Sequence, residues 1–288
     1  YELGSLFKIF STAAFLDKTP GGMEAMFDAT KPLKSGRHTI HDYHAQNKVM
    51  STPEVFMHSS NIGSALMGRA VGTDGLKEFY TDLGLLDPLD IGLKEIGKPQ
   101  APREWREINT LTAAYGHGLS TTPLQAAAAV ASIVNGGTRV TPKLLAGDEV
   151  RTGARIIQPA TSDQMRALMR LVVAEGTAKK AEVTGYDMGG KTGTAEKVSG
   201  GRYDKGSLLS SFVGVFPMSD PRYLVFVMVD EPKGNKESFG YATAGWVAAP
   251  AVGRVVEGMA AVLGLPPTEA PSVPSLHNDV SYTEGVVE

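Results

Sequence analysis

Apolar residues recur at helical spacing through most of the first half of the chain. Leu6, Ile9, Phe10 and Ala13 follow the i, i+3, i+4 rule, which predicts a buried helix that begins near Ser5. The same pattern predicts a short amphipathic helix at residues 23–30, a helix at 52–72 interrupted around 59–63, and helices at 72–85, 120–137 and 162–176. The first half is therefore expected to be mostly helical.

Two of these helices carry start or stop signals. Thr122 is the expected N-cap before Pro123, and Gly136 ends that helix, while Ser162 is the expected N-cap of the next one. The polar, proline-rich stretch at 97–105 predicts a long loop between helices.

The second half changes to strand patterns. Runs at 186–198, 210–218 and 222–232 are separated by short polar loops at 199–206 and 219–221, which implies two antiparallel hairpins. An amphipathic helix from Thr243 to about Leu263 would cover one face of that sheet. We predict an α/β (α+β) fold in which an antiparallel sheet is sandwiched by helices, with an all-helical subdomain.

Composition narrows the choice of function. The chain has 288 residues, a net charge of -3 and no Cys, which argues against nucleic acid as a partner and excludes thiol catalysis and disulfides. No apolar run is long enough to span a bilayer, and the start does not resemble a signal peptide, so we expect the chain to be part of a longer protein. Residues 1–264 are expected to form one domain, and the proline-rich residues 265–288 a flexible tail.

Three polar signatures interrupt the apolar patterns. "GSLFK" places Ser5 three residues before Lys8, "HSSNIG" places Ser59 two residues before Asn61, and "GGKTGTAEK" places Lys191 on a predicted strand. The motifs S-x-x-K, S-D-N and K-T-G together mark class A β-lactamases and penicillin-binding proteins. Each motif alone is weak, but the three in this order are specific.

These residue types suit nucleophilic catalysis. A Ser5 hydroxyl needs a base to remove its proton, and Lys8, one helical turn away, can do so only where its amine is partly neutral. Burial and the nearby charge of Lys191 would both favour that neutral form. Ser59 could pass the proton to a leaving amine, while Asn61 could hold Lys8 and bind a substrate amide.

The third motif would bind the substrate. Lys191 and the hydroxyls of Thr192 and Thr194 can attract a carboxylate, and Gly193 would leave the strand bare for a substrate peptide. The backbone N–H groups of Ser5 and Thr194 are the expected oxyanion donors.

With these motifs the sequence resembles the transpeptidase domain of class B penicillin-binding proteins, most closely the division-specific type. The resemblance continues through "YGHGLSTTPLQAAAAVASIVNGG", "SSFVGVFP" and "AGWVAAPAVGRVV", and so covers the chain to about Gly264. It implies a D,D-transpeptidase that cleaves a terminal D-Ala-D-Ala bond, cross-links peptidoglycan stem peptides through a serine acyl-enzyme, and is acylated by β-lactams.

The resemblance also assigns roles. It implies Ser5 as nucleophile, Lys8 as acylation base and Ser59 as proton relay, with Asn61, Lys191, Thr192 and Thr194 as binding residues. It implies no metal or organic cofactor, a site on the periplasmic face of the bacterial inner membrane, and division-complex proteins as partners. Family domains carry further strands of the same sheet before S-x-x-K, preceded by a pedestal and a membrane anchor, which this sequence does not include.

Structural interpretations stay open for each motif. Ser5 could be an N-cap followed by a snorkelling Lys8, Ser59 and Asn61 could stabilise a helix interruption, and K-T-G could be a plain hairpin strand. His38, His41 and His44 lack zinc-type spacing and favour structural roles, and His58 favours packing.

Two other functions also remain to be distinguished. A serine β-lactamase would need a group that activates water, for which Glu104 and Glu107 are the available carboxylates in the long loop region. A non-catalytic β-lactam sensor or division scaffold would bind or respond without cross-linking peptides.

Overall fold

We describe the protein from a computed structural model, which covers residues 1–145, 153–199, 202–267 and 286–287. The helices and short 3-10 turns are η1 (Gly4–Phe7), α1 (Lys8–Lys18), α2 (Thr52–His58), α3 (Asn61–Val71), α4 (Thr73–Asp82), α5 (Glu107–Ala113), α6 (Pro123–Val134), α7 (Pro159–Ala174), η2 (Lys179–Ala181) and α8 (Ala248–Leu263). The strands are β1 (Met26–Asp28), β2 (Leu33–Ser35), β3 (His38–Ile40), β4 (Val49–Ser51), β5 (Gly189–Ser199), β6 (Arg202–Phe216), β7 (Tyr223–Asp230) and β8 (Val286–Val287).

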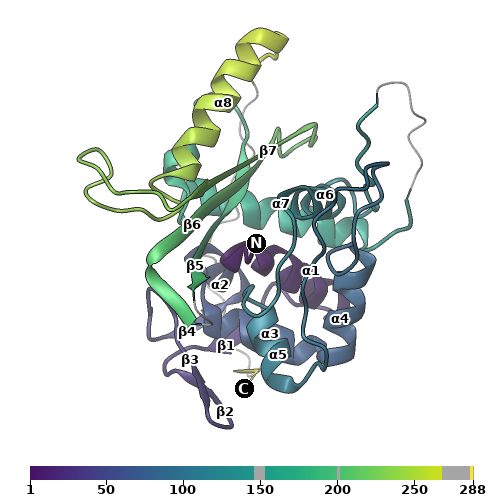
Figure 1. Ribbon diagram of the computed structural model, residues 1–288, viewed down its shortest axis with the longest axis vertical. Coiled ribbons are helices and arrows are strands. Elements are labelled where there is room, and N and C mark those ends of the chain that lie inside the picture. The colour runs from purple at the N-terminus through teal and green to yellow at the C-terminus, as the bar shows by residue number, and fades with distance from the viewer. Residues whose placement is uncertain (146–152, 200–201, 268–285, 288) are drawn as a thin grey trace.

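A three-stranded antiparallel sheet in the order β5-β6-β7 is covered by helices on both faces. Gly189 packs against the backbone of α7, whereas Gly214 packs against Val252 of α8. Gly190, the neighbour of Gly189, pairs with Gly214, and because successive strand residues face opposite sides, α7 and α8 lie on opposite faces. The predicted layering is confirmed. Figure 1 shows α8 toward one end of the molecule and α3 and α5 toward the other.

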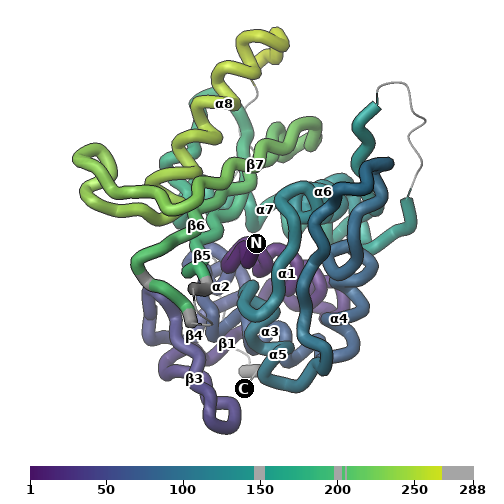
Figure 2. Tube along the Cα trace, in the orientation of Figure 1, coloured from purple at the N-terminus to yellow at the C-terminus, as the bar shows by residue number. Residues whose placement is uncertain are grey.

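Helix α1 is the centre of the helical part. Its residues from Lys8 to Leu16 are buried, and it packs against α3, α4, α6 and α7. Phe7 and Phe10 meet at a ring-centroid distance of 5.4 Å, and Tyr80 of α4 lies 5.6 Å from Phe7. In Figure 2 the purple start of the chain lies near the middle of the view, between the sheet and the helices. The first motif is thus held in the core.

Several predicted helix boundaries are confirmed by capping contacts. Thr122 caps α6 through Gln125, with Pro123 at the first position, and the helix ends before Gly136. The predicted interruption in 52–72 is the two-residue break between α2 and α3. Each start follows from a side chain that accepts a hydrogen bond from an otherwise free backbone N–H.

Other predicted elements were wrong. Residues 26–28 form strand β1 instead of a helix, because Phe27 is buried while its neighbours are not and the segment pairs with β4. Ser162 lies inside α7, which begins at Pro159, and its hydroxyl accepts a hydrogen bond from the Gly136 N–H. The predicted loop 199–206 is mostly strand, since β6 starts at Arg202 and pairs with β5 after a bulge at Glu196/Lys197.

The end of the domain is described only in part. Helix α8 begins at Ala248, later than the predicted Thr243, and ends before Gly264, which has a left-handed conformation. Leu265 still packs against the body, since its carbonyl accepts a hydrogen bond from the Tyr186 hydroxyl. The predicted division after residue 264 stays a prediction, and most of the tail, residues 268–285 and 288, lies outside the described residues.

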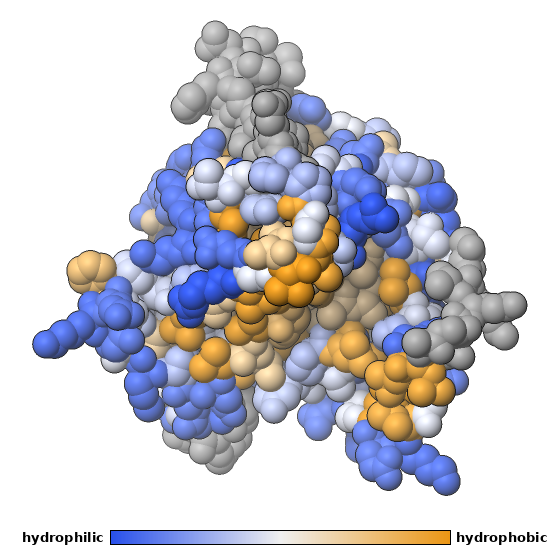
Figure 3. Space-filling model, turned by 90° about the horizontal axis from the view of Figure 1, so that it is seen from above, coloured by the Kyte–Doolittle hydropathy of each residue, from blue (hydrophilic) through white to orange (hydrophobic). Residues whose placement is uncertain are grey.

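Apolar residues gather near the middle of the face seen from above (Figure 3). Val255, Val262 and Leu263 are the large exposed apolar residues of α8. Within the described ranges, no helix is both long enough and apolar enough to cross a membrane.

Candidate active site

The structure brings the first two motifs together around one buried amine. The Nζ atom of Lys8 lies 3.0 Å from Ser5 Oγ, 3.1 Å from Ser59 Oγ, 2.5 Å from the Ser59 carbonyl oxygen and 2.8 Å from Asn61 Oδ1. Lys8 is fully buried, and among the described residues no carboxylate lies within ion-pairing distance of it. A buried cation without a counter-ion is costly, so this environment favours the neutral amine.

The oxygens around Lys8 are of types that suit a neutral amine. The Ser59 carbonyl and Asn61 Oδ1 can only accept, so they use both N–H groups of a neutral –NH₂. The nitrogen lone pair is then left to accept a hydrogen bond from one hydroxyl at a time, that of Ser5 or that of Ser59. Burial, and secondly the charge of Lys191, lower the pKa of Lys8 well below its usual value, while Asp42 raises it.

Lys191 of the third motif joins the same group. Its Nζ donates a hydrogen bond of 2.9 Å to Ser59 Oγ, and burial lowers the pKa of this fully buried lysine to about 7. Ser59 therefore lies between the two amines, each within about hydrogen-bonding distance of its hydroxyl. This arrangement suits a hydroxyl that passes a proton along.

The break between α2 and α3 positions Ser59 and Asn61. Ser59 has a left-handed backbone with φ 58°, which few residues other than glycine adopt, and it ends α2. Ser60 caps α3 by accepting a hydrogen bond from the Gly63 N–H, and Asn61 Nδ2 donates to the His41 carbonyl at 2.9 Å. The sequence around Ser59 thus folds as two helix ends that point one hydroxyl and one amide toward Lys8.

Close backbone contacts set the position of Ser5. A Cβ atom on Gly4 would lie 2.7 Å from the Thr194 carbonyl, and one on Gly116 would lie 2.1 Å from the Gly4 carbonyl. Only glycine allows these approaches, so the segment before Ser5 is fixed between β5 and the segment after α5. Ser5 itself lies within η1, and no side chain caps that turn, so the N-cap interpretation of Ser5 is wrong.

The structure corrects the expected reason for Gly193. A Cβ atom there would lie 2.6 Å from the Leu3 carbonyl and 2.8 Å from Leu6 Cγ. Gly193 therefore permits β5 to pack closely on η1, on the interior side, and does not bare the strand toward the cleft. Thr192 and Thr194 do line the cleft. The Thr192 hydroxyl lies 2.7 Å from Thr177 Oγ1, and the Thr194 hydroxyl accepts a hydrogen bond from the Ala244 N–H.

Ser5, Ser59, Asn61, Thr192 and Thr194 open into one cavity of about 700 Å³. Lys8 and Lys191 lie fully buried beside it. Its other walls are formed by the loop at 41–44, the segment at 176–180 and the segment at 243–246. The described structure thus unites the three motifs, while the role of each residue is still a proposal.

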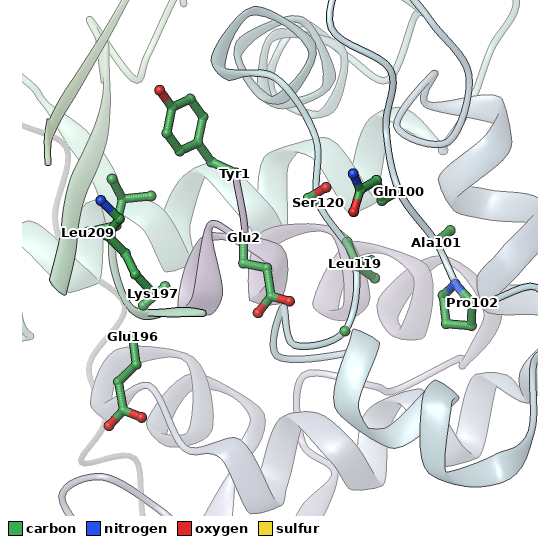
Figure 4. Close-up of a pocket in the computed structure, with 12 residues that line it drawn as sticks. Tyr1, Glu2, Gln100, Ala101, Pro102, Leu119, Ser120, Glu196, Lys197 and Leu209 are labelled. Atoms are coloured by element: carbon green, nitrogen blue, oxygen red, sulfur yellow. The ribbon is translucent and has the colours of Figure 1, made fainter. Parts of the chain in front are cut away.

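A smaller cavity of about 480 Å³ lies beside this one (Figure 4). Glu2, Gln100, Ser120 and Lys197 are among its lining residues, and Glu196 lines both cavities. Tyr203 connects the two, because its hydroxyl donates to Glu2 at 3.1 Å while its ring stacks on His117 of the larger cavity.

Two polar residues of the cleft, Asp42 and His117, were not predicted from the sequence. Asp42 accepts hydrogen bonds from the Ser60 hydroxyl at 2.9 Å and the Ile62 N–H at 2.9 Å, and so anchors the start of α3. His117 lines the cleft near Lys8. Neither lies in the three motifs, and the histidine-rich run "HTIHDYH" that contains Asp42 directs attention to metal binding, but His117 does lie in the stretch "YGHGLSTTPLQAAAAVASIVNGG" that carries the family resemblance.

The remaining candidate residues, the histidines and the two glutamates, differ in whether they line the cleft. His41, His44 and His58 line the cleft, His38 is exposed on β3, and within the described ranges no three such side chains could share a metal ion. Glu104 and Glu107 lie outside the cleft and pair with Arg106 and Arg69. A carboxylate-activated water from these two residues therefore has no support in the geometry.

The chain is similar to known proteins over most of its length. The family model of the penicillin binding protein transpeptidase domain matches residues 1–256. The probable peptidoglycan D,D-transpeptidase FtsI of Caulobacter vibrioides is 42% identical over 276 residues, which cover 92% of this chain and 47% of that protein. The stage V sporulation protein D of Bacillus subtilis is 35% identical, with 93% of this chain and 43% of that protein covered. The chain thus spans about half the length of these relatives.

Solved structures show the same fold. The transpeptidase domain of Burkholderia pseudomallei penicillin-binding protein 3 superposes with a TM-score of 0.84 at 29% identity, covering 93% of this chain and 81% of that one. Mycobacterium tuberculosis penicillin-binding protein 3, solved in complex with ampicillin, gives a TM-score of 0.82 at 26% identity, covering 95% of this chain and 65% of that one.

Proposed function

Since the chain belongs to the penicillin-binding protein transpeptidase family, we propose that it is a peptidoglycan D,D-transpeptidase whose nucleophile is Ser5. The observation that carries this proposal is the contact of 3.0 Å between Ser5 Oγ and the buried Lys8 amine, which the Ser59 and Asn61 oxygens orient. A neutral amine fixed at this distance from a hydroxyl can act as its general base.

The acylation step follows from these contacts. Lys8 takes the proton of Ser5, whose oxygen attacks the carbonyl carbon of the substrate's penultimate residue. The peptide C–N bond then breaks, and the proton passes from Lys8 through the Ser59 hydroxyl to the leaving amine. The products are a Ser5 ester, a free terminal D-Ala and a Lys8 amine that is neutral again.

The cleft supports the binding roles proposed for the third motif. Thr192 and Thr194 offer hydroxyls for the carboxylate of a terminal D-Ala, and the charge of Lys191 lies just behind them. Because Gly4 touches the Thr194 backbone, the N–H groups of Ser5 and Thr194 are the proposed donors to the oxyanion. A β-lactam, which presents a strained amide and a carboxylate, would fit the same groups.

The setting of the activity is also part of the proposal. The name of the Caulobacter relative supports a role in cross-linking the cell wall, and the resemblance of the sequence to the division-specific type favours septal synthesis. The substrate would then be a peptidoglycan stem peptide on the periplasmic face of the inner membrane, with division proteins as partners of the longer protein.

A donor peptide ending in D-Ala-D-Ala, incubated with an amine acceptor, tests the proposal. We expect release of D-Ala and an equal amount of cross-linked product in the wild type, and neither in Ser5→Ala. Release of D-Ala without any cross-linked product, at every acceptor concentration, would favour a hydrolase.

A further inference from the structure

The proposed acylation step leaves His117 of the cleft unused, although its backbone is held close to that of Ser5. We propose that His117 acts in the second half of the reaction, where its imidazole accepts the proton of the acceptor amine that attacks the Ser5 ester. This inference rests on the proposed function and deepens it. It assigns the two half-reactions to different bases, Lys8 for the acylation of Ser5 and His117 for the attack of the acceptor amine.

The backbone holds His117 beside the nucleophile. Gly116 is packed so tightly on Gly4 that a Cβ atom would lie 2.1 Å from the Gly4 carbonyl, and His117 and Ser5 are the residues that follow these two glycines. Both side chains line the same cavity. Lys8, by contrast, is fully buried and surrounded by four oxygens, so it is poorly exposed to a nucleophile that arrives through the cleft.

Aromatic contacts fix the His117 ring without using its nitrogens. Tyr203 of β6 stacks on the ring at a centroid distance of 5.0 Å and an angle of 22°, and Tyr115 packs at 5.2 Å. Tyr203 is itself held by its hydrogen bond to Glu2. Within the described structure neither ring nitrogen of His117 is hydrogen-bonded, so a ligand can use them.

The charge state of His117 suits a proton acceptor. Burial, and secondly the charge of Lys8, lower the pKa of His117 below its usual 6.5, so the imidazole is neutral at neutral pH. The other titratable groups around the ring are Tyr115 and Tyr203, whose pKa values are raised by burial, and Glu2, which reaches the ring through Tyr203.

The step balances in atoms and protons. The acceptor nitrogen attacks the ester carbonyl carbon, a C–N bond forms, and the N–H proton moves to His117. The bond between carbon and Ser5 Oγ breaks, and the oxygen takes a proton that the neutral Lys8 amine passes to it from water. His117 releases its own proton to water in exchange, so Lys8 and His117 are both neutral again at the end of the cycle.

The test separates the two half-reactions in His117→Gln and His117→Phe. Acylation is followed with a fluorescent penicillin, and aminolysis with a thioester donor and D-alanine as acceptor. We expect aminolysis to fall by ~10-fold or more in both variants, since a general base contributes at least that much, and acylation to change far less. His38→Gln, which replaces an exposed histidine on β3 outside the cleft, is the matched control and should keep the wild-type ratio of the two rates.

The pH profile provides a second readout. Below the pKa of His117, the wild-type aminolysis rate should lose one more factor of ten per pH unit than in His117→Gln, in which only the acceptor amine and the lysines titrate. An equal loss of acylation and aminolysis would show a merely structural role, and unchanged aminolysis would show no role; either result overturns the inference. A wild type that forms no acyl-enzyme would instead contradict the proposed function.

Discussion

Lys8 and Ser59 are 51 positions apart, yet the Lys8 amine contacts both the carbonyl oxygen of Ser59, at 2.5 Å, and its hydroxyl, at 3.1 Å. The carbonyl orients the amine, and the hydroxyl is within reach of its proton. Ser59 also accepts a hydrogen bond from Lys191, so a single residue links the two buried lysines.

The amine of Lys8 must be neutral to act as a base. Lys8→Arg places a guanidinium there, which stays charged at all accessible pH values. We expect the rate of Ser5 acylation to fall by ~1,000-fold or more in Lys8→Arg and Lys8→Ala, as for removal of a nucleophile's partner. Stopped-flow measurement with nitrocefin checks this, and a loss below ten-fold in both variants would show that another group is the base.

Acylation should rise with pH as Lys8 loses its proton. The charge of Lys191 is the second cause that lowers the pKa of Lys8, so Lys191→Gln removes a like charge and should raise that pKa. The rising limb of the acylation profile is therefore expected to move to higher pH in Lys191→Gln. A limb that stays in place would mean that the two amines do not interact.

Lys191 should support the acylation of Ser5 but destabilise the folded protein. Its pKa is about 7 in the folded protein, against about 10.4 when unfolded. The unfolded state binds more protons between these values. The loss of folding stability caused by buried Lys191 is therefore largest below about pH 7, and it declines as the pH rises toward 10. We expect Lys191→Met to slow acylation while raising the melting temperature, more at pH 6 than at pH 9. A lower melting temperature at both pH values would contradict this.

Asp42 should act by positioning α3. Asp42→Asn weakens its contacts with the Ser60 hydroxyl and the Ile62 N–H, and it removes a charge that raises the pKa of Lys8. We expect acylation to slow by ~10- to 100-fold, since hydrogen bonds to a charged group contribute about 1.5–3 kcal/mol, and its rising limb to move to lower pH. A slower rate without a shift of the limb would indicate a structural effect alone.

Gly116 should tolerate no side chain. Gly116→Ala places a Cβ atom 2.1 Å from the Gly4 carbonyl at a positive φ of 86°, and should both destabilise the fold and slow acylation. Gly258→Ala is the control, because nothing lies within 4 Å of its Cβ position and it is inside helix α8. That control should stabilise the protein by about 0.5–1 kcal/mol. Chemical denaturation measures both changes.

The sequence was most informative where chemistry needs fixed residue types. The three motifs predicted which side chains would meet. An S-x-x-K spacing puts Ser5 and Lys8 on one helix face, and the polar interruption at Ser59 within an apolar segment indicates a functional role. It was least informative about backbone proximity. The purpose of Gly193, the placement of His117 beside Ser5 and the contact of Asp42 with α3 all depend on segments far apart in sequence. No local pattern encodes such contacts, and β1 was mistaken for a helix for the same reason, since β4 decides its conformation.

The mass of the intact protein after exposure to benzylpenicillin tests the central claim most directly. We expect one added penicilloyl group, mapped by peptide digestion to Ser5, in the wild type and in Ser5→Cys at a changed rate, and no adduct in Ser5→Ala. An adduct that persists in Ser5→Ala, or that maps to another residue in the wild type, would show that the amine of Lys8 activates a different nucleophile or none.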